Sequence, residues 1–167
     1  MSRPTSGETP SLPLVEIAPG QRLAYDALLR LADDSESEIA GYRDRGTLFG
    51  LVDAEPGPPR GLVLADAGDM PGTIQLLSVA IAKAHQGRGL GSQMVAQVFE
   101  RLRARGWSRV VVSTASSSVA VLGFYQRLGF RMLRIDRDWF TAARGYPEDL
   151  EEDGIPVRDR VWLDRAL

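Results

Sequence analysis

The sequence contains no cysteine and only one histidine among its 167 residues. The absence of cysteine excludes disulfide bridges and a thiolate nucleophile. Transition metals in proteins are bound mainly by His and Cys side chains, and this chain has only one of them, so we expect no metal site. No apolar run is long enough to span a bilayer, and the first residues lack the basic cluster and apolar stretch of a secretory signal. We therefore expect a cytoplasmic protein without a membrane partner.

A large excess of charge of either sign is also absent. The chain has 20 basic and 22 acidic residues and a net charge of −2 at pH 7. Binding to nucleic acid requires a clearly basic surface, so we expect no nucleic-acid partner. The length and the hydrophobic content of 44% suit one globular domain with one core. We predict a disordered tail over residues 1–13, which are rich in Ser, Thr and Pro, and a single domain over residues 14–167.

Hydrophobic periodicity predicts an α/β fold. Helical spacing covers residues 21–31, 35–45, 90–105 and 116–129, and runs typical of strands cover residues 14–17, 47–52, 61–65, 74–81, 110–112, 130–135 and 157–163. This order of elements predicts helices packed on a mixed sheet.

Residues 86–91, with the sequence Gln-Gly-Arg-Gly-Leu-Gly, lie between a predicted buried strand and a predicted amphipathic helix. Glycines at alternate positions let backbone N–H groups converge on an anion, and the first helical turn adds unpaired donors and the positive end of its dipole. The loop should therefore hold a phosphate or pyrophosphate. A P-loop would need a Gly-Lys-Ser/Thr ending, and a dinucleotide fingerprint would need a different glycine spacing, so the sequence fits neither.

The pattern Q-x-x-G-x-G of Gln86, Gly89 and Gly91 resembles the pyrophosphate loop of the GNAT superfamily of acyl-CoA-dependent N-acyltransferases. About forty residues later, Phe-Tyr-Gln-Arg-Leu-Gly-Phe at residues 124–130 resembles that family's tyrosine-bearing helix end. The resemblance implies a mixed, mostly antiparallel central sheet of six to seven strands, flanked by about four helices. It also implies that the fourth and fifth strands splay apart to admit the pantetheine arm of acetyl-CoA, the expected co-substrate.

The resemblance further assigns residues to acetyl-CoA. The residues implied as its contacts are Val79, Ala80, Ile81, Gln86, Gly87, Arg88, Gly89, Leu90, Gly91, Ser92, Ser118 and Tyr125. The sequence departs from the family pattern at three positions. Ser118 and Val121 stand where many members have Asn and Ala, and Lys83 stands where proline is common. A serine at position 118 can still cap the helix that follows or contact a CoA phosphate.

Acyl transfer from a thioester to an amine needs a neutral amine, a donor to the carbonyl oxygen and a proton for the leaving thiolate. A backbone N–H of Val79 or Ala80 is our candidate for the donor. The family's motif implies Tyr125 as the general acid, although a tyrosine at a helix end often only packs in the core. Because the chain has no cysteine, we expect direct attack by a primary amine of a small molecule or peptide in a ternary complex.

The general base stays unassigned, because the predicted strand over residues 73–81 contains no carboxylate. The remaining candidates are Glu36, Glu38, Asp66, Asp69, Asp136, Asp138, and a water held by backbone carbonyls and Ser78. Two other interpretations therefore remain. One is a non-catalytic CoA-binding or sensory module on the same fold, and the other is a phosphate-binding structural protein of unrelated fold. Binding of CoA would exclude the latter, and turnover would exclude the former.

Residues 138–156 form a long connection between the last two predicted strands, with three aromatic residues and an acidic run at residues 148–153. Long ordered loops often cover binding sites. Our hypothesis is that this segment covers the acceptor site or forms a homodimer contact, and that its acidic run attracts a cationic amine. The alternative is a surface loop held in place by its aromatic side chains.

Overall fold

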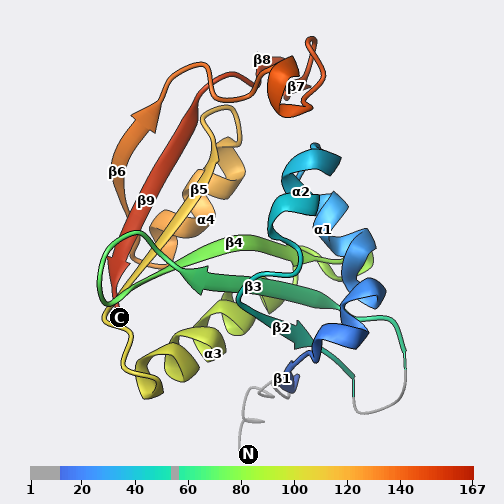
Figure 1. The fold of residues 1–167 in the computed structure, drawn as a ribbon, viewed down its shortest axis with the longest axis vertical. Coiled ribbons are helices and arrows are strands. Elements are labelled where there is room, and N and C mark those ends of the chain that lie inside the picture. The colour runs from blue at the N-terminus through green and yellow to red at the C-terminus, as the bar shows by residue number, and fades with distance from the viewer. Residues whose placement is uncertain (1–11, 54–56) are drawn as a thin grey trace, which may run out of the picture.

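The computed structural model describes residues 12–53 and 57–167, and a seven-stranded sheet forms its centre (Figure 1). The strands of this sheet are β1 (Leu14–Glu16), β2 (Thr47–Leu51), β3 (Gly61–Ala67), β4 (Thr73–Ile81), β5 (Arg109–Ala115), β6 (Arg131–Asp136) and β9 (Arg160–Ala166). Their order is β1-β2-β3-β4-β5-β9-β6, and only β4 and β5 are parallel neighbours. This confirms the expected mixed, mostly antiparallel sheet.

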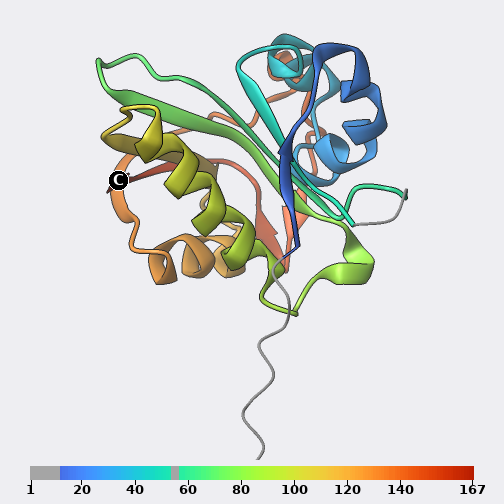
Figure 2. The same cartoon turned by 90° about the horizontal axis from the view of Figure 1, so that it is seen from below.

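Helices cover both faces of the sheet (Figure 2). One face carries the 3-10 helix η1 (Pro19–Tyr25), α1 (Asp26–Ala32) and α2 (Glu36–Tyr42), and the other carries α3 (Leu90–Ala104) and α4 (Val119–Arg127). The helix expected over residues 21–31 is thus a 3-10 helix followed by α1. The buried Arg22 ties this 3-10 helix to the turn after α2, because its guanidinium donates to the carbonyl oxygens of Arg43, Arg45 and Gly46. None of the described helices is both long and apolar enough to cross a membrane.

Residues 1–11 of the expected disordered tail lie outside the described residues. The next two residues of that expected tail are bonded to the body of the protein. The carbonyl oxygen of Leu12 accepts a hydrogen bond of 3.1 Å from Gln97 Nε2, and that of Pro13 accepts one of 3.2 Å from the Val52 N–H.

The sheet separates two hydrophobic cores. The larger core lies against α3 and α4, and the smaller core lies against α1 and α2. On β4, Leu76 and Val79 belong to the larger core, whereas Leu77 and Ala80 belong to the smaller one. Two consecutive residues of β4, Leu77 and Ser78, therefore lie on the α1 and α2 face. The cause is a β-bulge, because Leu64 pairs with Ser78 and Ala65 pairs with Leu76, which leaves Leu77 unpaired.

The expected separation of the fourth and fifth strands is present. β4 and β5 pair over only four residues each, from Thr73 with Arg109 to Leu76 with Val112. Beyond this point β4 continues to Ile81 in register with β3, and β5 continues to Ala115 in register with β9. The two strands diverge, and among the described residues no strand pairs with the edge of β4 beyond Leu76 on the β5 side.

Two short segments complete the fold. The 3-10 helix η2 (Lys83–His85) leads from β4 into the glycine loop. The connection between β6 and β9 contains the 3-10 helix η3 (Ala142–Arg144) and a small hairpin of β7 (Glu151–Glu152) and β8 (Ile155–Pro156). This hairpin was not expected from the sequence, because two-residue strands leave no periodic pattern.

Candidate active site between the splayed strands

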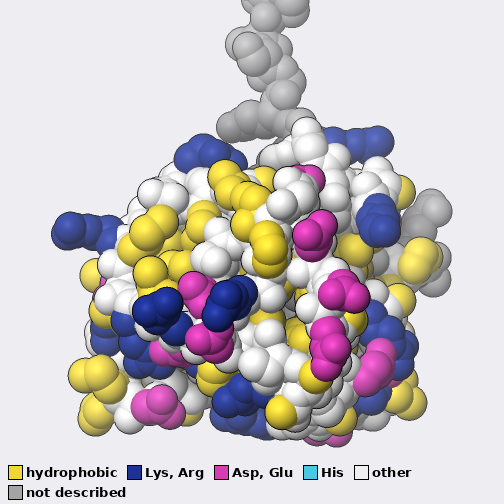
Figure 3. All heavy atoms as spheres, turned by 90° about the horizontal axis from the view of Figure 1, so that it is seen from above, with side chains coloured by type: hydrophobic (Ala, Val, Ile, Leu, Met, Phe, Trp, Pro, Cys, Tyr) yellow, Lys and Arg dark blue, Asp and Glu magenta, His cyan; other side chains and the backbone are white. Residues whose placement is uncertain are grey.

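A cleft of about 960 Å³ opens where β4 and β5 separate. Its walls come from these two strands, the junction of α1 and α2, the start of α4, and the connection between β6 and β9. Figure 3 views the end of the molecule where α2 and the β7–β8 hairpin lie, and acidic and basic side chains alternate there around apolar ones. On this face, the described residues form no broad patch of one sign.

The backbone of Val79 faces the gap between the strands. Ala82 N–H donates to Arg60 O at 2.8 Å, which makes these two residues a hydrogen-bonded pair of the β3–β4 ladder. Such pairs alternate along an antiparallel ladder, so Ala80 with Leu62 is bonded and Val79 with Val63 is not. The N–H of Val79 therefore points away from β3, toward the open edge, whereas the N–H of Ala80 is used within the sheet. Of the two expected donors to the carbonyl oxygen, only Val79 therefore has an N–H that the pairing of β3 with β4 leaves unused.

The glycine loop lies at the end of β4 that borders the cleft. Gly87 and Gly89 have positive φ angles of 73° and 75°, which other residues rarely adopt, and a Cβ at either position would meet no atom within 4 Å. Gln86 ties the loop to β4, because its Nε2 donates to Ile81 O at 2.9 Å. Within the described residues, the backbone N–H groups of residues 87–92 have no hydrogen-bond partner. These free donors lie just before α3 and in its first turn, at the positive end of the helix dipole, so the loop is suited to bind an anion.

The structure brings some of the expected CoA contacts to the cleft and leaves others beside it. Residues that line the cleft are Val79, Ala80, Ile81, Gln86, Ser118 and Tyr125. The loop residues from Gly87 to Ser92 lie outside the cleft lining, and among them Arg88 and Ser92 are exposed and Leu90 is buried. The Ser118 hydroxyl donates to Glu152 at 2.5 Å and makes no capping bond to α4, which corrects the expected capping role.

Tyr125 lies in the last turn of α4 and is 5% exposed. Its ring packs edge-on against Phe124 and Phe130, at centroid distances of 5.2 and 5.3 Å. Burial raises the pKa of Tyr125 well above its ordinary value, so the phenol stays protonated at neutral pH. The residue therefore belongs to the core and also lines the cleft with a group that can donate a proton.

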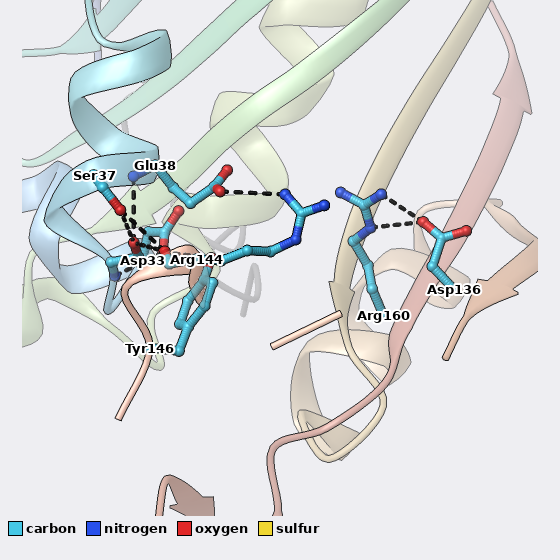
Figure 4. Close-up of polar contacts among 8 residues, drawn as sticks. Asp33, Ser37, Glu38, Asp136, Arg144, Tyr146 and Arg160 are labelled. Atoms are coloured by element: carbon cyan, nitrogen blue, oxygen red, sulfur yellow. Dashed lines mark hydrogen bonds and ion pairs between the residues drawn. The ribbon is translucent and has the colours of Figure 1, made fainter. Parts of the chain in front are cut away.

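Asp33 follows α1 on the opposite wall of the cleft, and the sequence did not single it out. Its carboxylate accepts hydrogen bonds from the Ser35 N–H at 3.0 Å, the Tyr146 hydroxyl at 3.0 Å and the Tyr42 hydroxyl at 3.3 Å. Burial is the main reason that the pKa of Asp33 is raised, and the nearby charge of Glu38 adds to it, although the three donors oppose the shift. Figure 4 shows Asp33 with Glu38 and Tyr146 on one side of the cleft.

The connection between β6 and β9 reaches across the cleft to α2. The carbonyl oxygen of Arg144 accepts hydrogen bonds from the hydroxyls of Ser35 at 2.6 Å and Ser37 at 3.0 Å. The Arg144 guanidinium lies 3.5 Å from Glu38 (Figure 4). It also stacks on the Trp139 ring at 3.5 Å from the centroid. These contacts hold the connection as one wall of the cleft.

A second arginine stacks on the same indole. Arg160 lies 3.1 Å from the centroid of the Trp139 ring and is ion-paired with Asp136 at 2.5 Å (Figure 4). Asp136 also accepts a hydrogen bond of 2.7 Å from Trp162 Nε1. Cation–π and ion-pair contacts thus fix the aromatic side chains at this end of the cleft.

The carboxylates expected as base candidates mostly lie in ion pairs away from the reacting groups. The pairs are Glu36 with Arg30, Asp66 with Arg45, Asp136 with Arg160, and Asp138 with Arg158. Asp69 lies exposed in the turn before β4. Of these candidates only Glu38 lines the cleft, where it pairs with Arg144. Over the described ranges, no group of three or more His, Asp or Glu side chains could hold a metal ion.

Comparisons with known proteins agree with this geometry. The model of the Acetyltransferase (GNAT) family matches residues 9–130. An uncharacterized N-acetyltransferase of Bacillus subtilis is 34% identical over 139 residues, which are 83% of this chain and 86% of that protein. The structure of an IAA acetyltransferase from Bacillus cereus has a TM-score of 0.83 and 32% identity, and covers 94% of this chain and 100% of that one. A GNAT family acetyltransferase from Elizabethkingia anophelis, solved with acetyl-CoA bound, has a TM-score of 0.84 and 28% identity, over 95% and 100% of the two chains.

Proposed function

Because the chain belongs to the GNAT family of acetyltransferases, we propose that it transfers the acetyl group of acetyl-CoA to a primary amine by direct attack in a ternary complex. The observation that carries this proposal is the gap between β4 and β5, which presents the free N–H of Val79 next to the glycine loop. The absence of cysteine favours direct transfer over a cysteinyl acyl-enzyme.

The residues present fit acetyl-CoA. The unpaired N–H groups of residues 87–92, at the start of α3, suit the pyrophosphate. The open edge of β4 beyond Leu76 can pair with the amide groups of the pantetheine arm as an added strand would. A related structure, that of the Elizabethkingia anophelis enzyme, holds acetyl-CoA.

Two groups of the chain are placed to act on a thioester in the gap. The Val79 N–H is oriented to donate to the carbonyl oxygen, where negative charge develops during attack. Tyr125 supplies the proton for the departing thiolate, and its raised pKa means that the hydroxyl carries that proton at neutral pH. Both residues lie on the cleft wall, as is required if one donates to the carbonyl oxygen and the other protonates the sulfur of the same thioester.

The acceptor amine, carried by a small molecule or a peptide, enters from the other side of the cleft. This side lies between the α1–α2 junction and the connection from β6 to β9. Its aromatic residues and the carboxylates of Asp33, Glu38 and Glu152 suit an amine that arrives as an ammonium ion.

One feature favours a second candidate function, a CoA-binding module without turnover. β4 carries no carboxylate, so the strand next to the thioester offers no base of its own. This alternative predicts acetyl-CoA binding with no transfer to any amine.

The test is the release of CoA thiol from acetyl-CoA in the presence of amine pools, measured with a colorimetric thiol reagent. The protein itself gives no background, because it has no cysteine. Amine-dependent release is the expected result. Binding of acetyl-CoA in calorimetry, with no release from pools of polyamines, amino acids, aminoglycosides and peptides, would favour the CoA-binding module instead.

A further inference from the structure

A line of hydroxyl and carboxyl groups leads from the reacting end of β4 to Asp33. Its first member is Ser78, which is 5% exposed and lines the cleft next to Val79. The β-bulge at Leu77 turns Ser78 toward the α1 and α2 face. Within the described part of the chain, Ser78 Oγ is buried and has no hydrogen-bond partner. A buried hydroxyl without a partner is unusual in a folded protein and indicates a place for a ligand atom or water.

Tyr42, the last residue of α2, is the second member. It lines the cleft, and burial raises its pKa, whereas the nearby Ser78 hydroxyl acts to lower it. The two hydroxyls nevertheless lie outside hydrogen-bond geometry. The Tyr42 hydroxyl donates its proton to Asp33 Oδ2 at 3.3 Å. Its oxygen lone pairs therefore remain free to accept a proton from the side of Ser78.

We propose that the Tyr42 hydroxyl accepts a proton from the ammonium group of the acceptor while it passes its own proton to Asp33. This inference rests on the proposed acetyl transfer and assigns the base that the sequence left open. Tyr42 is then the catalytic residue, because it contacts the amine. Asp33 acts through Tyr42 and is a positioning residue that receives the proton.

The protons balance over one turnover. The N–C bond forms, the C–S bond breaks, and the nitrogen loses two of the three protons of the ammonium group. The first leaves through Tyr42 to Asp33 and then to solvent. The second replaces the proton that Tyr125 gives to the thiolate. Besides Tyr42, the groups that act on Asp33 are the Ser35 N–H, the Tyr146 hydroxyl and the charge of Glu38. Burial favours the protonated form of the carboxyl, so it can hold the proton it receives.

The test compares two matched amines at neutral pH. Ethylamine carries a proton there and needs a base, whereas trifluoroethylamine is already neutral and does not. The variants Tyr42→Phe and Asp33→Asn should lower kcat/KM for ethylamine about 100-fold, the usual worth of an acid–base group. Both variants should lower kcat/KM for trifluoroethylamine much less. The ratio of kcat/KM for ethylamine to kcat/KM for trifluoroethylamine should therefore fall.

Tyr146→Phe is the matched control. It removes another hydroxyl from the same carboxylate and leaves the Tyr42 contact intact. A merely structural role for these groups would lower the rates with both amines alike, and Tyr146→Phe should do so. Thermal melting checks that each variant is folded.

The proposal is overturned if Tyr42→Phe is active and has the same ratio of kcat/KM for the two amines as the wild type. If the wild-type protein binds acetyl-CoA in calorimetry but acetylates neither these two amines nor any amine pool, the proposed function is wrong. The proposed proton transfer through Tyr42 to Asp33 is then wrong as well. The two failures are therefore distinguishable, because only the first leaves wild-type turnover intact.

Discussion

Val79 and Val63 oppose each other as a non-hydrogen-bonded pair between β4 and β3. This pairing turns the N–H and C=O of Val79 toward the gap left by β5. Side-chain substitution cannot remove a backbone donor, but the register that aims it depends on the bulge at Leu77.

Tyr125→Phe should lower turnover about 100-fold, because the thiolate then leaves without a proton from the enzyme. The substitution keeps the ring that packs on Phe124 and Phe130, so stability and acetyl-CoA binding should change little. Steady-state kinetics with calorimetric binding of acetyl-CoA separate the two effects. Unchanged turnover would leave Tyr125 with a packing role only.

Gly89→Ala should weaken acetyl-CoA binding and cost about 1–2 kcal/mol of stability, because a positive φ is unfavourable for alanine. Gly106→Ala is the matched control. Gly106 also has a positive φ, of 84°, with no atom within 4 Å of an added Cβ, and it lies past the far end of α3. Its variant should lose similar stability in urea unfolding and bind acetyl-CoA as the wild type does. Equal binding by both variants would argue against the loop as the phosphate site.

Ser78→Ala should raise the free energy of unfolding by about 1 kcal/mol, because it removes a buried hydroxyl that has no partner. The same variant should lower turnover, since it removes a polar group that lines the cleft next to Val79. Urea unfolding and thiol release measure the two quantities on one preparation. A loss of stability would show that Ser78 has a hydrogen-bond partner in the folded protein.

Asp33 should make the protein less stable as the pH rises. Its pKa is raised in the folded state, so the folded protein holds this proton more tightly than the unfolded chain. The loss begins above the ordinary pKa of 3.8 and is complete above the folded pKa. Asp33→Asn should abolish this part of the pH dependence, which urea unfolding at a series of pH values can measure. An unchanged slope would mean that the carboxyl titrates normally.

Asp136 should have the opposite effect. Although desolvation opposes it, hydrogen bonds from Trp162 and Arg160 keep the pKa of Asp136 below its ordinary value of 3.8. Its contribution to stability is therefore fully present above pH 3.8 and is lost as the pH falls through the folded pKa. Asp136→Asn should be less stable than the wild type at neutral pH, and the difference should shrink in acid. A difference that is constant with pH would show that the charge of Asp136 does not matter.

The sequence predicted the elements whose signal is local. The strand before Gln86 and the helix after Gly91 are periodic over many residues, and the glycine loop between them is a contiguous motif. The divergence of β4 and β5 followed from the family resemblance, and the structure places Val79 and Tyr125 on one cleft.

The acceptor side could not be predicted in this way, because long-range contacts create it. Asp33 is buried partly by Tyr146, which lies 113 residues further along the chain. Ser35 contacts the Arg144 carbonyl from a similar separation. The bulge at Leu77 depends on how β4 pairs with β3, and the residues of β4 taken alone do not show where that pairing shifts. Nothing local distinguishes Asp33 from Asp34, its neighbour in sequence.

The position of β9 between β5 and β6 constrains how the molecule can assemble. β5 and β6 are made before β9, yet neither pairs with the other. β5 can pair with β4 first, but β6 pairs only with β9, so β6 and the connection that walls the cleft join the sheet only when β9 inserts. Pairing across so large a sequence separation is slow. The acceptor side of the cleft should therefore be among the last parts of the protein to form during folding.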